Sequence, residues 1–299
     1  MTLKKYRSPA WLIFLFMMSF MTCGAAFGAV LDQRLENTLQ SADADEFVPV
    51  IIQFAEPPEI ESFAVRGLKR GEERAAARAK LIRHLRNHAD GSQQNVIRYL
   101  RQQGVTGERP LWLINALAVK LTAAQVEDIA ALPEVESIRY DEVIRLSQPA
   151  PTVTPLAISL DNLDAVHARE LWGLGYKGAG VVVGVMDSGV EVTHPALADS
   201  WRGGSNSWFD PYKNTTLPYD PVYPTDPEGS GHGTAVSGVI LGEDGSGASF
   251  GVAPDAKWIA AKIFDDEGSA DNSRIHQAFQ WMLDPDGNLS TDDAPHIVN

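Results

Sequence analysis

The stretch that decides the fold is Val181-Val-Val-Gly-Val-Met186, which runs directly into Asp187-Ser-Gly. An uninterrupted apolar run of this length, rich in β-branched residues, predicts a strand buried on both faces of a parallel sheet. A second motif, Gly-His232-Gly-Thr, opens another apolar stretch at residues 235–241, which predicts a buried helix. Asp187 is therefore expected at the carboxyl end of a strand, and His232 at the start of a helix.

An acid and a histidine placed in this way are two parts of a Ser-His-Asp arrangement in the chain order Asp, His, Ser. Taken singly, each has a structural explanation. Asp187 can cap a turn, and His232 can be held between glycines at a helix end. Their order favours the catalytic interpretation. No plausible glycine-flanked nucleophilic serine follows His232 in the sequence.

Four motifs in this order resemble those of the subtilisin-like serine proteases, the subtilases. They are Gly178-Ala-Gly-Val-Val-Val-Gly-Val-Met-Asp187-Ser-Gly-Val190, His194-Pro195, Gly231-His232-Gly-Thr-Ala-Val-Ser-Gly238 and Gly251-Val-Ala-Pro254. Four motifs in the family's order are far more specific than one. The resemblance implies a doubly wound α/β domain, built on a parallel sheet, over residues 160–299.

The resemblance also implies the chemistry, which is hydrolysis of polypeptide substrates by acyl transfer. His232 would accept the proton of the nucleophilic serine, and Asp187 would hold the imidazole in place. In the family, the oxyanion asparagine and the serine lie beyond the strand that Pro295-His-Ile-Val-Asn299 resembles. The sequence is therefore expected to be the N-terminal part of a longer serine endopeptidase, with an incomplete protease domain and no activity of its own.

Alignment with the family pattern assigns Gly268, Ser269 and Ala270 to substrate binding. In the family this segment is a sheet edge that pairs with the extended substrate backbone. Such pairing needs small residues with free backbone N–H and C=O groups. Without the alignment, an ordinary Gly-Ser turn explains the same residues equally well.

Residues 1–28 have the pattern of a secretory signal peptide. Lys4, Lys5 and Arg7 precede an apolar core at residues 10–21, and small residues follow. The protein is therefore expected to be secreted, either extracellular or periplasmic, with no membrane association after cleavage. An uncleaved membrane anchor is the alternative. Cys23, the one cysteine, lies in this segment, so the exported chain is expected to have no disulfide.

Residues 30–147 have the pattern of a small α+β domain in the order β-α-β-β-α-β, the ferredoxin-like arrangement. The expected strands are residues 47–54, 111–114, 116–121 and 135–140. Pro49 favours an edge position for the first strand. Gly91 is expected to break the first helical region in two. Thr122 and Gln125 have the spacing of a capping box at the second helix.

This arrangement resembles the propeptides of subtilases, particularly at Ala116-Leu-Ala-Val-Lys-Leu-Thr122 and Leu132-Pro-Glu-Val-Glu-Ser-Ile138. The resemblance implies a domain that covers the protease domain in cis, assists its folding, inhibits it and is removed. The Pro-rich residues 148–159 would be the linker. Two alternatives stay open: an inhibitor or folding assistant joined to a non-catalytic protease remnant, and a pseudoprotease that binds peptides.

Other segments of the protease domain give weaker signals. Residues 166–174 predict a helix, and residues 198–229 an aromatic-rich surface insertion without regular structure. Its aromatic side chains are expected to pin the loop to the surface, with a substrate-contacting wall as the alternative. A helix near residues 272–283 is expected to be capped by Asp271 or Asn272 and to leave His276 in solvent. Its apolar side chains are predicted to be core: Ile275, Ala278, Phe279, Trp281 and Met282.

Charge and composition restrict the ligands. The net charge is −14, and the acidic excess is concentrated after residue 147, which argues against nucleic-acid binding. Asp284-Pro-Asp-Gly-Asn288 looks like the start of a calcium loop but lacks the later bidentate glutamate. No cofactor or metal ligand is identifiable, although the family resemblance makes calcium a candidate.

Overall fold

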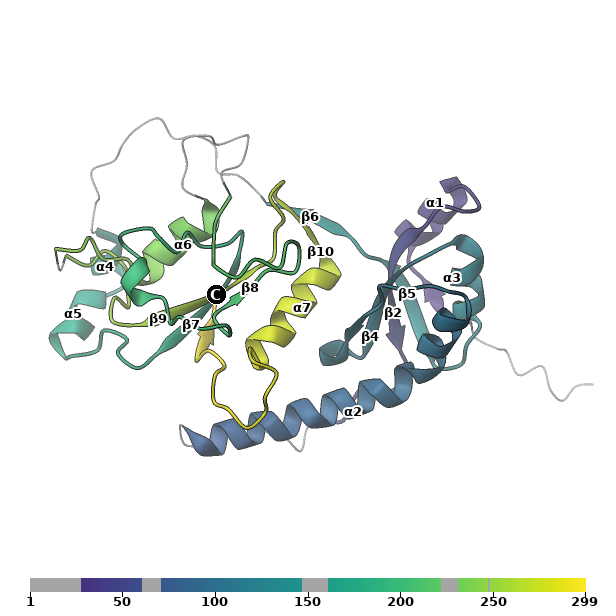
Figure 1. The fold of residues 1–299 in the computed structure, drawn as a ribbon, viewed down its shortest axis with the longest axis horizontal. Coiled ribbons are helices and arrows are strands. Elements are labelled where there is room, and N and C mark those ends of the chain that lie inside the picture. Colours follow the sequence, from purple (N-terminus) through teal and green to yellow (C-terminus); the bar gives the residue numbers. More distant parts are fainter. Residues whose placement is uncertain (1–27, 61–70, 147–160, 222–230, 247) are drawn as a thin grey trace, which may run out of the picture.

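The computed structural model describes residues 28–60, 71–146, 161–221, 231–246 and 248–299. The predicted linker at residues 148–159 lies outside these ranges. So does the predicted signal peptide, except for Gly28. The described residues form two units, each with its own sheet (Figure 1). No helix among the described residues is both long enough and apolar enough to span a bilayer.

The first unit covers residues 28–146. Its elements are β1 Val30–Leu31, α1 Gln33–Ser41, β2 Val48–Phe54, α2 Glu72–Gln102, β3 Arg109–Leu111, the 3-10 turn η2 Trp112–Ile114, β4 Ala116–Leu121, α3 Ala123–Ala130, β5 Val135–Tyr140 and β6 Val143–Arg145. Five strands form one sheet in the order β1-β5-β2-β4-β3. Strands β2 to β5 pair antiparallel, as the predicted β-α-β-β-α-β order requires.

The predicted edge position of the first strand is wrong, because β2 lies between β4 and β5 in the centre of the sheet. Pro49 is tolerated there because it is the second residue of the strand. The ladder with β5 begins only at Val50, opposite Tyr140. The carbonyl of Pro49 still accepts a hydrogen bond from the Asp141 amide at 3.0 Å. A proline at the start of a central strand therefore removes no donor that the ladder needs.

The predicted break at Gly91 is also wrong, since α2 is continuous. Gly91 is exposed, and a side chain there would meet nothing within 4 Å. Ile82 and Leu85 before it, and Val96 and Leu100 after it, are all buried. A glycine inside a helix costs about 1 kcal/mol relative to alanine. Burial of apolar side chains on both sides of Gly91 outweighs that cost.

The predicted strand at residues 111–114 is only partly present. Leu111 ends β3, and residues 112–114 form the turn η2. Asn115 ends the turn in a left-handed conformation, with φ of 49°, and is fully buried. Its side chain oxygen accepts a hydrogen bond from the Ser92 hydroxyl at 2.6 Å. The predicted capping box is confirmed: Thr122 and Gln125 exchange side-chain and backbone hydrogen bonds at the start of α3.

The second unit covers residues 161–299. Its elements are α4 Asp161–Ala165, α5 Ala168–Gly173, β7 Val182–Asp187, the 3-10 turn η3 Ala198–Ser200, β8 Trp208–Phe209, α6 His232–Leu241, β9 Lys257–Lys262, β10 Ser269–Asp271, α7 Asn272–Leu283 and β11 Ile297–Val298. Four parallel strands form its sheet in the order β11-β7-β9-β8.

Helices cover both faces of this sheet, as the predicted α/β class requires. Alternate residues of a strand point to opposite faces. On β9, Trp258 packs in one buried cluster with Leu241 of α6. The next residue, Ile259, packs in the other cluster with Ala278 and Met282 of α7. The parallel sheet is thus buried between α6 and α7.

The prediction of an insertion without regular structure needs correction. Residues 198–229 contain regular structure, because η3 and β8 lie in their described part. Trp208 is only 7% exposed, and its ring lies edge-on to that of Tyr219 at 6.0 Å. These rings pin the segment to the core, which is the interpretation that the sequence favoured. The predicted helix at 166–174 is present as α5, which begins two residues later because the φ of His167, 56°, is left-handed.

Helix α7 shows where the two units meet. Ala278 and Met282 are buried as predicted, but Phe279 is 44% exposed. His276 is half-buried and not solvated, because the first unit packs over this face of the helix. Burial lowers the pKa of His276, and the nearby Arg139 guanidinium of the first unit lowers it further. The sequence could not predict this burial, because the covering residues come from the other unit.

Candidate active site

The structure brings the two predicted catalytic residues together. Asp187 is the last residue of β7 and is 8% exposed, while His232 is the first residue of α6. The Nδ1 atom of His232 lies 2.7 Å from Oδ1 of Asp187. An ionised carboxylate only accepts hydrogen bonds, so Nδ1 carries the proton and donates it. The Nε2 atom is then left as the basic nitrogen of the ring.

The buried carboxylate of Asp220 accepts hydrogen bonds from residues close to both members of this pair. Asp220 accepts the Ser188 hydroxyl at 2.8 Å on one oxygen. Its other oxygen accepts both the amide and the hydroxyl of Thr234, each at 2.7 Å. Ser188 follows Asp187, and Thr234 lies in the first turn of α6, so Asp220 ties the two motif segments together. Burial raises the pKa of Asp220, and the charge of Asp187 adds to this, while the hydrogen bonds oppose it.

The glycines of the two motifs allow this close approach. Gly189 has a φ of 129°, and a side chain there would lie 2.0 Å from the carbonyl oxygen of Tyr219. A side chain on Gly233 would lie 2.0 Å from the carbonyl oxygen of Gly189. A side chain on Gly231 would lie 1.9 Å from the carboxylate of Asp220. Only glycine lets the backbones approach this closely.

A buried lysine fixes the same loop from the neighbouring strand. Lys262 ends β9, is fully buried, and its Nζ donates to the carbonyl of Ser188 at 2.7 Å. Its counter-ion is Asp266, at 3.2 Å. Burial lowers the pKa of Lys262, and Asp266 opposes that shift. Neither Lys262 nor Asp220 was predicted from the sequence, because each lies far along the chain from the residues it holds.

The three predicted substrate-binding residues lie at a strand edge that β6 of the first unit occupies. Residues 269–271 form β10, which pairs antiparallel with β6. Ser269 lies opposite Arg145, and the Leu146 amide donates to the Gly268 carbonyl at 2.8 Å. Gly268 has a φ of 76°, so the turn into the edge needs glycine. Ala270, in the middle of β10, is buried.

The first unit also caps α7. The predicted cap, Asp271, makes no side-chain capping hydrogen bond. Asp141 of the first unit takes that role, accepting the Ser273 amide at 2.9 Å and the Ser273 hydroxyl at 2.5 Å. Arg109 donates to the same Ser273 hydroxyl at 2.6 Å and lies 3.3 Å from Asp141. A carboxylate at the N-terminus of a helix is favoured by the helix dipole and by the free amides.

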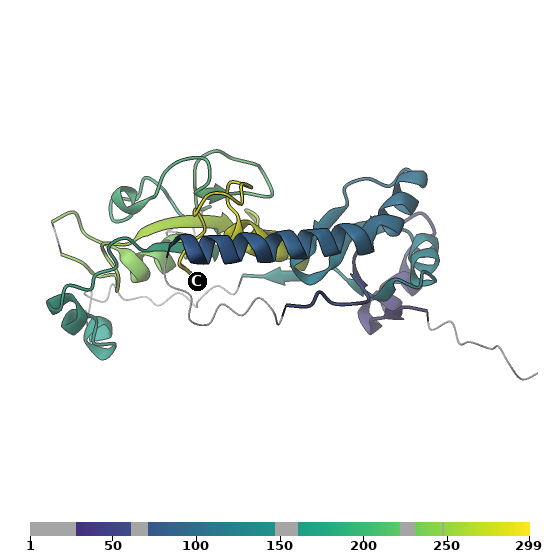
Figure 2. The same ribbon diagram turned by 90° about the horizontal axis from the view of Figure 1, so that it is seen from below.

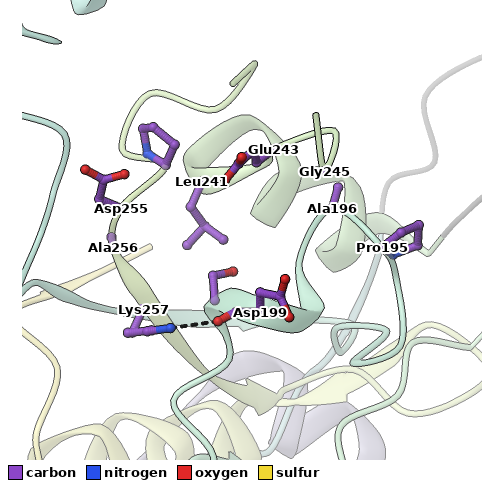
Figure 3. Close-up of a pocket in the computed structure, with 11 residues that line it drawn as sticks. Pro195, Ala196, Asp199, Leu241, Glu243, Gly245, Asp255, Ala256 and Lys257 are labelled. Carbon is purple, nitrogen blue, oxygen red and sulfur yellow. Dashed lines mark hydrogen bonds between the residues drawn. The ribbon is translucent and has the colours of Figure 1, made fainter. Parts of the chain in front are cut away.

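Two cavities lie elsewhere, and neither is lined by Asp187 or His232. One, of about 280 Å³, lies between α6 and η3; its walls include Asp199, Glu243 and Lys257 (Figure 3). There, Lys257 donates to the Asp199 carbonyl at 2.7 Å. The other, of about 450 Å³, lies between α2 and α7. Asp187 and His232 themselves lie at the carboxyl end of β7 and at the start of α6.

The predicted calcium-like segment gathers three carboxylates. Oxygens of Asp284, Asp286 and Asp293 lie within 4.8 Å of one another. Calcium takes six to eight oxygen ligands. Here Asp284 is engaged by the Arg86 guanidinium at 2.8 Å, and Asp286 accepts the Thr291 hydroxyl at 2.9 Å. Oδ1 of Asp293, by contrast, is buried and has no hydrogen-bond partner among the described residues, so protein donors do not engage every oxygen of this cluster.

Comparison with known proteins agrees with this geometry. Residues 178–299 match the model of the subtilase family. The chain is 30% identical over 301 residues to Bacillopeptidase F of Bacillus subtilis strain 168, covering 90% of this chain and 20% of that protein. It is 32% identical over 184 residues to Subtilisin E of the same strain, covering 62% of this chain and 43% of that protein.

Two solved structures are also similar. Fervidolysin from Fervidobacterium pennivorans, a keratinolytic enzyme related to subtilisin, aligns at a TM-score of 0.45 with 17% identity, over 91% of this chain and 37% of its own. The epidermin leader peptide processing serine protease of Staphylococcus aureus aligns at a TM-score of 0.49 with 13% identity. This alignment covers 81% of this chain and 49% of that protein's chain. The chain thus spans less than half the length of the relatives that it matches. Residues 178–299, which carry the four ordered motifs on an α/β sheet, are therefore similar to the subtilase family.

Proposed function

We propose that this chain is part of a secreted serine endopeptidase that hydrolyses polypeptides through a Ser-His-Asp acyl-enzyme mechanism. The 2.7 Å contact between Asp187 and His232 is the observation that carries the proposal. The contact leaves Nε2 of His232 free to take the proton of a serine hydroxyl and later to return it to the leaving amine. Asp187 holds the ring in that tautomer and stabilises the imidazolium that forms. Part of the protein outside these 299 residues would supply the serine, so the chain alone would be inactive.

Hydrolysis of casein by the full-length protein tests this proposal. His232→Ala is expected to abolish turnover, and His167→Ala is the matched control because His167 is an exposed histidine whose partner, Glu170, is also exposed. Wild-type turnover in the His232→Ala variant would exclude the assignment. A fluorophosphonate probe that labels residues 1–299 on their own would contradict the proposed position of the serine.

We propose further that residues 30–147 are a propeptide domain that inhibits residues 160–299 in cis, with residues 148–159 as the linker. Two contacts support this role: β6 occupies the β10 edge, and Asp141 caps α7. The edge at residues 268–270 would hold the substrate backbone once β6 has left. The first unit, expressed separately, should inhibit the processed enzyme at micromolar concentration. Absence of inhibition would leave the non-inhibitory alternatives, including a peptide-binding pseudoprotease.

Secretion is proposed from the sequence pattern of residues 1–28 alone. The test is the N-terminus of the exported protein, measured by mass spectrometry. Cleavage after Ala26 or Gly28 is expected. Retention of the intact N-terminus in a membrane fraction would favour the anchor instead.

A further inference from the structure

Helix α2 reaches beyond the unit to which it belongs. Its C-terminal half packs in the first unit's core, where Val96 and Leu100 are fully buried. Its N-terminal half extends beneath α7 and the loop that follows α7 (Figures 1 and 2). That loop, residues 284–296, connects α7 to β11. We call residues 284–293 the acidic loop, because they include four aspartates.

The stronger of two contacts between α2 and this loop involves a buried carboxylate. Nη2 of Arg86 lies 2.8 Å from Oδ2 of Asp284. The Asp284 side chain is only 2% exposed, while that of Arg86 is 36% exposed. The Arg86 guanidinium also lies over the Trp112 ring, 5.0 Å from its centroid, so its position is fixed by its own unit. A buried carboxylate of this kind needs a counter-charge, and the first unit supplies it.

The second contact is made by Arg78, which lies nearer the start of α2 than Arg86. Nη1 of Arg78 lies 3.1 Å from Oδ1 of Asp292, and its Nη2 donates to the Thr291 carbonyl at 3.2 Å. Arg78 is 21% exposed and Asp292 is 53% exposed. This pair is partly screened by solvent, so its energetic weight is smaller than that of the buried pair. Its two hydrogen bonds nevertheless fix where the loop lies on α2.

The acidic loop brings several carboxylates together: Asp293 and Asp286 interact with the charge of Arg202 in the second unit, whereas Asp284 pairs with the first unit. Asp284 is the residue that ends α7, where the helix dipole disfavours a negative charge. Oxygens of Asp286 and Asp293 lie within 4.8 Å of an Asp284 oxygen and add repulsion. The second unit's own nearby cation, Arg202, donates to the backbone carbonyl of Asp293 at 2.5 Å. Among the described residues, the ion pair of Asp284 is made with Arg86 of the first unit.

We propose that Arg78 and Arg86 of α2 form a recognition surface whose partner is a subtilase unit with a carboxylate-rich loop after α7. The proposal rests on the proposed cis role of the first unit and adds the basis of its specificity. Backbone pairing between β6 and β10 reads few side chains, so it discriminates poorly between subtilase units. The contacts of Arg78 and Arg86 with aspartates do discriminate between subtilase units. A unit that lacks the acidic loop would leave both arginines without these ion pairs.

Hydrogen exchange in the 299-residue chain, read by mass spectrometry, tests this proposal. Arg86→Glu and Arg78→Glu should each speed exchange in residues 284–293 by about tenfold or more, because each places like charges in contact. Arg83→Glu is the matched control, since Arg83 is exposed on the same helix and its Nε donates within that helix, to the Ala79 carbonyl. That variant should leave exchange in the acidic loop unchanged.

A charge exchange guards against a variant that simply fails to fold. Combining Arg78→Glu with Asp292→Arg restores an opposite-charge pair at a partly exposed position and should recover the slow exchange. Wild-type exchange rates in Arg78→Glu and Arg86→Glu, or no recovery in the exchanged pair, would overturn the proposal. None of these measurements needs peptidase activity, so they stand or fall separately from the proposed catalytic function.

Discussion

At the scale of single residues, the sequence predicted two residues that the structure places in contact, Asp187 and His232, but not the residues that support them. Asp187 and His232 lie in motifs that their own flanking residues identify. Asp220 has no such context, because it acts only when the fold brings residues 188 and 234 to it. Lys262 is hidden in the same way at the end of an apolar strand. Local sequence therefore singles out Asp187 and His232, whereas the groups that hold them in place depend on tertiary contacts.

The buried Asp220 should give the protein an unusual pH dependence. Its pKa in the folded state is raised above the unfolded value of 3.8. The unfolded chain therefore loses this proton first, so the contribution of Asp220 to stability falls as pH rises from 3.8 through the folded pKa. The free energy of unfolding of the wild type minus that of Asp220→Asn should decrease over this interval. Urea unfolding at several pH values measures this difference. A difference that stays constant or increases with pH would show that burial does not raise the pKa of Asp220.

Gly233 should tolerate no side chain. A methyl group would lie 2.0 Å from the Gly189 carbonyl oxygen, against backbone that cannot move aside. Gly233→Ala is expected to cost more than about 3 kcal/mol of unfolding free energy. Gly173→Ala is a suitable control because a side chain there meets nothing within 4 Å. Equal stability of the two variants in thermal unfolding would mean that the two motif segments do not approach this closely.

At the scale of elements, periodicity predicted which segments form helices and strands, and errors arose where packing overrode a local signal. Gly91 should break a helix by propensity, yet burial on both sides keeps α2 continuous. Pro49 should mark an edge strand, yet its place at the start of β2 costs no hydrogen bond that the ladder needs. The burial of His276 was missed because another unit covers it. Each error concerns contacts between elements that are distant in sequence.

The continuous helix makes Gly91 a site for stabilisation. The position is exposed, helical and free of neighbours within 4 Å. Gly91→Ala should raise the free energy of unfolding by about 0.5–1 kcal/mol, because alanine loses less backbone entropy in a helix. Gly104→Ala is the opposing control, since Gly104 has a φ of 69° that alanine adopts only with strain. Destabilisation by Gly91→Ala in chemical unfolding would indicate a helix that is broken at this position.

At the scale of the whole molecule, two units are joined by contacts at both ends of α7. Asp141 binds the N-terminal end of this helix, and Arg86 binds the residue that ends it. Each unit has its own pattern of strands and helices in the sequence. The reach of α2 was not predictable, since nothing in its amphipathic pattern distinguishes the half that packs on its own sheet from the half that contacts the other unit.

In the proposed mechanism, Asp187 and His232 act as one unit in proton transfer. The most direct measurement compares kcat of the full-length enzyme with that of His232→Ala, Asp187→Ala and the double variant. We expect losses of about 10⁴- to 10⁶-fold for the single variants, and a double variant no slower than His232→Ala alone, because residues that act as a unit are strongly non-additive. Losses that multiply in the double variant, or a His232→Ala variant with wild-type kcat, would contradict the account.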